Sequence, residues 1–105
     1  MRRFFSGIVS LTMLLSGCAI SSQENISRLE LIKKRNELIC GVSGKIPGFS
    51  FLESDGSYQG LDVDICKAFA AAFIGDAEKI QYRPLTAAER FTAIKTGEID
   101  LLSRN

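Results

Sequence analysis

The sequence contains no histidine, and its basic and acidic residues nearly balance, at 13 and 12. Without histidine, a Ser-His or Cys-His pair for nucleophilic catalysis is excluded. No close-spaced cysteine pair occurs, so a zinc site is not expected either. A chain without a basic stripe offers no electrostatic support for nucleic-acid binding. We therefore expect a protein that is not an enzyme, holds no metal and binds no nucleic acid.

Glycine-rich phosphate loops are also missing. Gly44-Lys45 is followed by isoleucine rather than serine or threonine, and Ile39 stands where a P-loop needs glycine. No G-x-G-x-x-G motif occurs. These departures argue against a nucleotide site, and we expect no cofactor.

A long hydrophobic run is lacking as well. Residues 4–15 form an apolar stretch behind Arg2 and Arg3, but a bilayer span needs roughly 20 apolar residues, so an export signal is predicted. Leu15-Ser16-Gly17-Cys18 resembles the lipobox of bacterial lipoproteins. The resemblance implies removal of residues 1–17, lipid on Cys18 and a membrane-anchored protein of the periplasm. An ordinary secretory signal with an incidental cysteine is the alternative.

Two cysteines remain if Cys18 carries lipid. Cys40 and Cys66 are an even pair in an oxidising compartment, where disulfides form and persist. A bridge between them would close a loop of about 27 residues and stabilise the fold by about 3.5 kcal/mol in the chain-entropy model. The alternative is two small apolar residues packed in the core.

The order of predicted elements indicates an α/β fold. After a polar tether, a helix over residues 24–35 ends at Asn36, which tolerates a left-handed cap. A strand at 38–43 follows, then a hairpin of 49–51 with 58–59 and a helix from Asp62 or Asp64 to Gly75. The next strand, at 79–83, is ended by Pro84. A Thr86–Glu89 capping box opens the last helix, which ends at Gly97, and a strand at 99–102 comes after it. Strand-helix-strand-helix-strand order predicts a parallel sheet with right-handed crossovers.

Candidate binding residues follow the carboxyl ends of these strands, where ligands enter open α/β sheets. Arg90 lies in the first turn of a helix and can hold a carboxylate bidentately, or it can pair with Glu89 or Asp100 at the surface. Ser103, Arg104 and Asn105 follow the last strand, as ligand donors or as a plain polar loop.

Two further pairs of residues have open roles. Phe49 and Phe51 can wall a pocket or pack under the hairpin. Asp62 and Asp64 can be read as paired catalytic carboxylates, but at a helix start we expect them to cap the helix and complement its dipole.

Several stretches together resemble one family. They are residues 40–43, 46–50, 60–66 (GLDVDIC), 84–93 (PLTAAERFTA) and 97–105 (GEIDLLSRN). They are similar to the first lobe of periplasmic solute-binding proteins of polar amino-acid ABC importers, family 3, in the general L-amino-acid branch. The resemblance implies a type II fold of two α/β lobes that close on an amino acid and deliver it to a membrane permease.

The resemblance also implies roles for individual residues. By position, Arg90 would contact the ligand carboxylate, and Ser43, Arg104 and Asn105 would lie in the pocket of the first lobe. Phe49 and Phe51 would form an aromatic wall, and Asp62 and Asp64 would have a structural role.

Three segments are expected: a lipoprotein signal peptide at 1–17, a lipid-anchored tether with the N-terminal helix at 18–36, and an incomplete first lobe at 37–105. The family pattern continues past Asn105, so the second lobe is expected to be absent and residues 18–105 to bind amino acids weakly or not at all. Alternatives are a truncated gene remnant with no binding activity of its own and a fragment of a periplasmic enzyme on the same scaffold.

Overall fold

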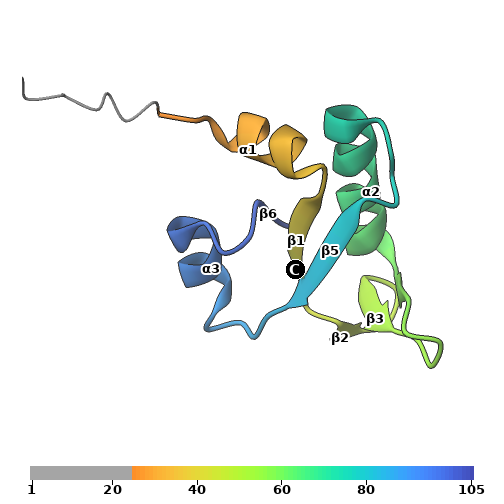
Figure 1. Ribbon diagram of the computed structural model, residues 1–105. Helices are drawn as coiled ribbons and strands as arrows, with labels where there is room; N and C mark the ends of the chain where they lie inside the picture. The colour runs from red at the N-terminus through yellow and green to blue at the C-terminus, as the bar shows by residue number, and fades with distance from the viewer. Residues whose placement is uncertain (1–24) are drawn as a thin grey trace, which may run out of the picture.

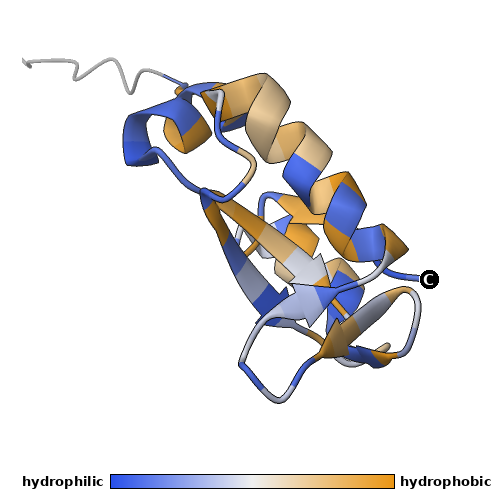
Figure 2. Ribbon diagram, turned by 90° about the vertical axis from the view of Figure 1, so that its right-hand side faces the viewer, coloured by the Kyte–Doolittle hydropathy of each residue, from blue (hydrophilic) through white to orange (hydrophobic). Residues whose placement is uncertain are grey.

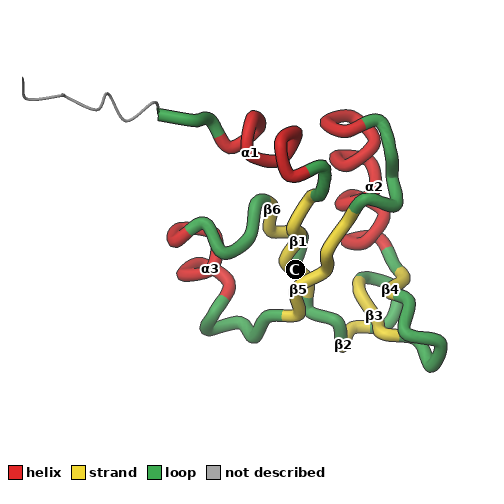
Figure 3. Tube along the Cα trace, viewed as in Figure 1, coloured by secondary structure: helices red, strands yellow, loops and turns green. Residues whose placement is uncertain are grey.

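The computed structural model describes residues 25–105. The predicted signal peptide, the lipidation site at Cys18 and the tether lie outside the described residues. Figures 1 and 3 show the path of the chain and its elements. The elements are α1 (Arg28–Arg35), β1 (Leu38–Val42), β2 (Lys45–Ile46), β3 (Ser50–Leu52), β4 (Tyr58–Gln59), α2 (Leu61–Ile74), β5 (Ile80–Pro84), α3 (Arg90–Thr96) and β6 (Leu101–Leu102).

The main sheet has three parallel strands in the order β5-β1-β6. Helices α2 and α3 form the two crossovers and cover opposite faces of the sheet (Figure 1). The predicted strand-helix-strand-helix-strand order is therefore confirmed. β5 ends at Pro84 as predicted, but Pro84 belongs to the strand and pairs with Val42 as its last residue. Proline is tolerated there because β5 lies at the sheet edge and needs no outward hydrogen bond.

The core lies on both sides of β1. Alternate residues of a strand face opposite sides of a sheet, and Leu38, Cys40 and Val42 are fully buried towards α2. On the other side, Gly41 allows close approach: a Cβ there would lie 2.6 Å from Cδ1 of Ile99. Ile99 packs there with the buried side chains of Leu85 and Ala93.

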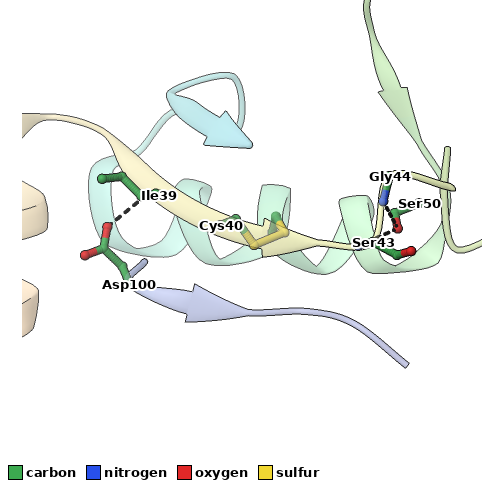
Figure 4. The surroundings of a disulfide bond; sticks show 7 residues. Ile39, Cys40, Ser43, Gly44, Ser50 and Asp100 are labelled. Carbon is green, nitrogen blue, oxygen red and sulfur yellow. Dashed lines mark hydrogen bonds between the residues drawn. A yellow bond between two sulfur atoms is a disulfide. The ribbon is translucent and has the colours of Figure 1, made fainter. Parts of the chain in front are cut away.

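A disulfide joins the central strand to its covering helix (Figure 4). Cys40 of β1 and Cys66 of α2 are both fully buried, with their Cα atoms 6.1 Å apart. The bond spans 26 positions of sequence, so it constrains the unfolded chain over the whole segment between β1 and the middle of α2.

Helix α1 is shorter than predicted because its N-cap comes later. The Ser27 hydroxyl accepts from the Glu30 N–H at 3.2 Å, and the Glu30 carboxylate accepts from the Ser27 N–H at 2.9 Å. This reciprocal capping box starts the helix at Arg28. At the other end, Asn36 has φ of 58°, which confirms the predicted left-handed cap.

Asp100 attaches α1 to the sheet. Its side chain is fully buried, and its carboxylate accepts from the backbone N–H of Ile39 at 2.8 Å (Figure 4). Arg28 binds the same carboxylate at 3.2 Å, and Arg35 is its second ion-pair partner. Both arginines come from α1, so this single carboxylate fixes the helix at the amino ends of the strands.

A small antiparallel sheet carries the predicted hairpin. Strands β3 and β4 pair as expected, and β2 adds a third strand that was not predicted. The buried Ser50 hydroxyl accepts from the N–H groups of Ser43 and Gly44 at 3.1 and 3.0 Å (Figure 4). The small sheet is thereby attached to the exit of β1.

The start of α2 differs from the prediction. The N-cap is Gly60, no side chain caps the helix, and the first helical residue is Leu61. Asp62 and Asp64 lie inside the first turn, where a carboxylate complements the helix dipole without capping. Gly75 ends the helix in the left-handed conformation, as predicted. Within residues 25–105, no helix combines the length and hydropathy that a membrane crossing requires.

Candidate functional site

A cleft of about 460 Å³ opens at the carboxyl ends of β1 and β5. Parallel strands end at the same edge of a sheet, so the loops that follow them meet there. The cleft is lined by Ser43, Lys45, Pro84, Leu85, Thr86, Ala87, Glu89 and Arg104. Of the predicted binding residues, the structure brings Ser43 and Arg104 together here.

The wall after β5 is held by reciprocal bonds between Thr86 and Glu89, the pair predicted as a capping box, although they span a turn before α3 and do not cap that helix. The Glu89 carboxylate accepts from both the N–H and the hydroxyl of Thr86 at 2.8 Å, and the Glu89 N–H donates to the Thr86 hydroxyl at 3.3 Å. These bonds hold the pKa of the Glu89 carboxyl below its usual value. The carboxylate stays ionised and bound to the loop. The helix itself begins one residue later than Glu89, at Arg90, because residues 87–89 form a turn.

Arg104, which follows β6, is bonded to the segment after β5. Its Nε donates to the Leu85 carbonyl at 3.2 Å, and its Nη1 donates to the Asn105 carbonyl at 3.1 Å. These two contacts leave further N–H groups of the guanidinium for a ligand, since an arginine has five. Asn105 itself is exposed and is not among the cleft-lining residues.

The chemistry of the cleft suits an anionic group. It contains two cationic side chains, Lys45 and Arg104, and the hydroxyl residues Ser43 and Thr86, while its one acidic side chain is occupied by Thr86. Guanidinium and ammonium groups form charge-assisted hydrogen bonds with carboxylates. The arrangement can hold a carboxylate and offers no paired acid and base.

Arg90 lies outside this lining. Its guanidinium carbon is 4.7 Å from the centre of the Phe91 ring, a cation–π contact, and its Nε is buried without a hydrogen-bond partner in residues 25–105. It pairs with neither Glu89 nor Asp100, which bind Thr86 and the α1 arginines. The expected surface pairing with Glu89 or Asp100 is therefore not observed, and the role of Arg90 as a contact for a ligand carboxylate stays a prediction.

The two phenylalanines are also outside the cleft lining. Phe51 lines a separate hollow of about 300 Å³, together with Pro47, Gly48, Glu53, Gln59 and Gly60. The Phe49 side chain is 37% exposed, and its carbonyl accepts from the Asp62 N–H at 2.9 Å. Their suggested role as an aromatic wall stays a prediction.

Sequence reasoning missed Lys45, Thr86 and Glu89 as lining residues. Lys45 was considered only as part of a possible phosphate loop, although it lies two residues beyond Ser43, at the exit of β1. Thr86 and Glu89 were predicted only as a helix cap. They also line the cleft, because the loop that their bond holds is one of its walls. Within the described part of the chain, no three potential metal-ligand side chains gather at one point.

The fold and cleft can be compared with known proteins. The chain is 53% identical over 77 residues to the putative amino-acid ABC transporter-binding protein YhdW of Escherichia coli K12, covering 73% of this chain and 23% of that protein. It is 46% identical over 101 residues to the glutamate/glutamine/aspartate/asparagine-binding protein BztA of Rhodobacter capsulatus, covering 96% of this chain and 28% of that protein. The chain thus spans about a quarter of the length of these curated relatives.

Solved structures show the same fold. An ABC transporter periplasmic binding protein from Brucella ovis with glutathione bound has a TM-score of 0.73 at 42% identity, over 75% of this chain and 25% of that one. The arginine-bound form of domain 1 of TmArgBP has a TM-score of 0.64 at 28% identity, over 72% and 57%. An ancestral cyclohexadienyl dehydratase has a TM-score of 0.65 at 29% identity, over 75% and 32%.

The structural neighbours place the parallel sheet within the fold of periplasmic binding proteins. The sequence match to the family covers residues 38–105, from the first residue of β1 to the residues beyond β6. The chain belongs to the bacterial extracellular solute-binding proteins, family 3.

Proposed function

We propose that this chain is part of the substrate-binding component of an amino-acid ABC importer, and that its cleft holds the carboxylate of an L-amino acid. One observation carries the proposal: Lys45 and Arg104 meet at the carboxyl ends of the strands, beside Ser43. The names of YhdW and BztA, an amino-acid ABC transporter-binding protein and a glutamate/glutamine/aspartate/asparagine-binding protein, support the same ligand class.

Binding would be reversible capture without chemistry. Arg104 is oriented before a ligand arrives, because its Nε is bonded to the Leu85 carbonyl. A side chain that is already ordered loses less conformational entropy on binding. Lys45 supplies a second positive charge, and Ser43 lines the cleft with its backbone N–H held by the Ser50 hydroxyl. The captured amino acid would then be passed to a permease in the membrane.

A binding experiment tests this assignment. We expect the amide signals of a ¹⁵N-labelled chain of residues 18–105 to shift around the cleft on titration with L-glutamine or L-glutamate. Because the cleft is open to solvent, the dissociation constant should be weaker than micromolar. Calorimetry on the same sample gives an independent value, and micromolar affinity would overturn the expectation of weak binding.

Matched substitutions locate the site. Arg104→Gln and Lys45→Met should abolish the shifts. Arg83→Gln and Lys33→Met remove the same charges outside the cleft and should leave the shifts unchanged. Shifts that survive in the Arg104 and Lys45 variants would refute this cleft as the site. No shift with any amino acid would favour the alternative of a gene remnant without binding activity.

Export and anchoring are a second part of the proposal. We propose that residues 1–17 are removed and that Cys18 carries lipid, which holds the protein at the periplasmic face of a membrane. In cells fed a labelled fatty acid, the wild-type chain should take up label and sediment with membranes. Cys18→Ser should do neither. An unlabelled wild-type protein in the soluble periplasmic fraction would contradict lipidation.

An enzyme on the same scaffold is the second candidate, since an ancestral cyclohexadienyl dehydratase shares the fold. The cleft argues against it, because its single carboxylate, Glu89, is bonded twice to Thr86. A dehydratase assay distinguishes the binding protein from the enzyme. It measures the loss of water from a cyclohexadienyl substrate through the ultraviolet absorbance of the aromatic product. Turnover that disappears in a Glu89→Gln variant would favour the enzyme.

A further inference from the structure

Ser50 places a buried hydroxyl against the main chain of another segment. The residue is fully buried, and its Oγ accepts from the backbone N–H groups of Ser43 and Gly44 at 3.1 and 3.0 Å (Figure 4). A serine oxygen has two lone pairs, so these two bonds use its full capacity as an acceptor. A buried N–H group without a partner is costly. One hydroxyl therefore satisfies two main-chain donors at the point where β1 ends.

The two bonds hold a bend of the chain at Gly44, beside the small sheet that lies below the carboxyl ends of the main strands (Figure 2). The φ of Gly44 is 75°, in the left-handed region that favours glycine. Its carbonyl accepts from the Leu52 N–H at 3.2 Å, so β3 binds this residue through both its N–H and its carbonyl. A Cβ at Gly44 would lie 3.3 Å from the Cβ of Pro84, which lines the cleft. The bend is therefore held by β3 and lies against a cleft-lining residue.

The residues on either side of this bend, Ser43 and Lys45, line the cleft, whereas Ser50 does not. Lys45 also pairs with Phe51, the neighbour of Ser50 in β3. We infer that Ser50 is a positioning residue for the cleft: its hydroxyl fixes the bend at Gly44 and thereby positions Ser43 and Lys45. A backbone that is fixed before binding lowers the entropy lost when a ligand is held. The inference rests on the proposed function only in that the cleft is taken as the binding site.

Hydrogen exchange tests the bend without an added amino acid. In the ¹⁵N-labelled wild-type chain, the amide protons of Ser43 and Gly44 should exchange slowly. Ser50→Ala removes their acceptor and should speed both exchanges about tenfold, the factor expected for one lost hydrogen bond. Leu38, at the other end of β1, should change far less, and equal acceleration there would overturn the inference by indicating a general loss of stability. Wild-type amides of Ser43 and Gly44 that exchange as fast as the exposed turn at 54–55 would also overturn it, and this result needs no variant to fold.

Titration with L-glutamate tests the consequence for the cleft. Ser50→Ala should raise the dissociation constant about tenfold, because Ser43 and Lys45 are no longer held in place. Ser50→Thr keeps the hydroxyl oxygen and should recover most of the lost affinity. Recovery by this conservative variant separates the loss of the acceptor from a general effect on the fold.

Two serine variants serve as controls. Ser57→Ala removes an exposed hydroxyl from the hairpin of the same small sheet, and Ser27→Ala removes the cap of α1 and lowers stability away from the cleft. Both should leave the affinity unchanged. An affinity that Ser50→Ala leaves unchanged, or that Ser27→Ala lowers equally, would overturn the inference. A wild-type chain that binds no amino acid would refute the proposed function, and the exchange of Ser43 and Gly44 would still decide the role of Ser50.

Discussion

Removal of the Asp100 charge tests how α1 is held to the sheet. The Asp100→Asn substitution keeps an oxygen that can accept from the Ile39 N–H, now at 2.8 Å, but loses the negative charge that binds Arg28 and Arg35. Because the carboxylate is fully buried, these interactions are only weakly screened by water. The substitution should therefore loosen α1 while the sheet keeps its register.

The structure sets the expected magnitude. Hydrogen bonds to charged groups contribute about 1.5–3 kcal/mol each. The arginine side chains are 45% and 34% exposed, so water resolvates them and the combined loss should be about 2–3 kcal/mol. Asp100→Ala also leaves the Ile39 N–H without a partner, which adds about 1–3 kcal/mol. For a domain stable by about 5–15 kcal/mol in total, these are large effects.

The arginine variants provide a sharper comparison. Arg28→Ala or Arg35→Ala alone should cost about 1 kcal/mol or less, because the other arginine still neutralises the carboxylate. The double variant leaves a buried charge without any cation and should cost about 3–5 kcal/mol, more than the sum of the single changes.

Urea unfolding followed by circular dichroism measures these differences. Asp64→Asn, an exposed aspartate on α2, is the control and should be near neutral. If Asp100→Asn changes the free energy of unfolding no more than this control does, the carboxylate does not hold the helix. Additive costs for the two arginine substitutions would equally refute the reasoning.

Three further predictions concern stability. Gly60→Ala should prevent folding or destabilise it severely, because a Cβ at this φ of 131° would lie 2.2 Å from the Phe49 carbonyl oxygen; a normal unfolding midpoint would contradict this. In exported protein, Cys40 and Cys66 should resist alkylation until reductant is added. Replacing both with serine should lower the free energy of unfolding by about 3.5 kcal/mol in the chain-entropy model. Two freely alkylated thiols by intact mass would exclude the bridge. Thr86→Ala should lower stability by about 1 kcal/mol in the same unfolding assay because it removes the hydroxyl bonds to Glu89, and an unchanged midpoint would show that these bonds are dispensable.

Local signals in the sequence predicted the architecture well. Asn36 and the glycines at 75 and 97 do end the three helices. The reciprocal bonds between Thr86 and Glu89 form as well, but over a turn before α3 and not as the N-cap of that helix. Such signals succeed because each depends on backbone geometry within one turn of helix. The strand-helix-strand-helix-strand order then predicts parallel pairing, and the structure adds that β1 is the central strand.

Boundaries and small elements were less predictable. The first helix starts at Arg28 because Ser27 caps it, although the Ser-x-x-Glu signature of that cap was present in the sequence. The two-residue strand β2 carries no periodic pattern, since a strand this short exists only because β3 pairs with it. Asp62 showed the limit of a motif: a carboxylate beside a helix start is read as a cap, yet Gly60 occupies the cap position.

The sequence by itself determined the α/β order, the helix ends and two cleft residues, Ser43 and Arg104. The element order, the helix ends and Arg104 follow from rules that act over a few residues or from the common edge where parallel strands end, whereas Ser43 followed from the family resemblance. Only the tertiary structure decided that Asp100 binds Arg28 across 72 positions and that Arg90 stacks on Phe91 outside the cleft. A charged side chain has several partners of opposite charge in any sequence, and packing selects among them because burial makes every unpaired alternative costly.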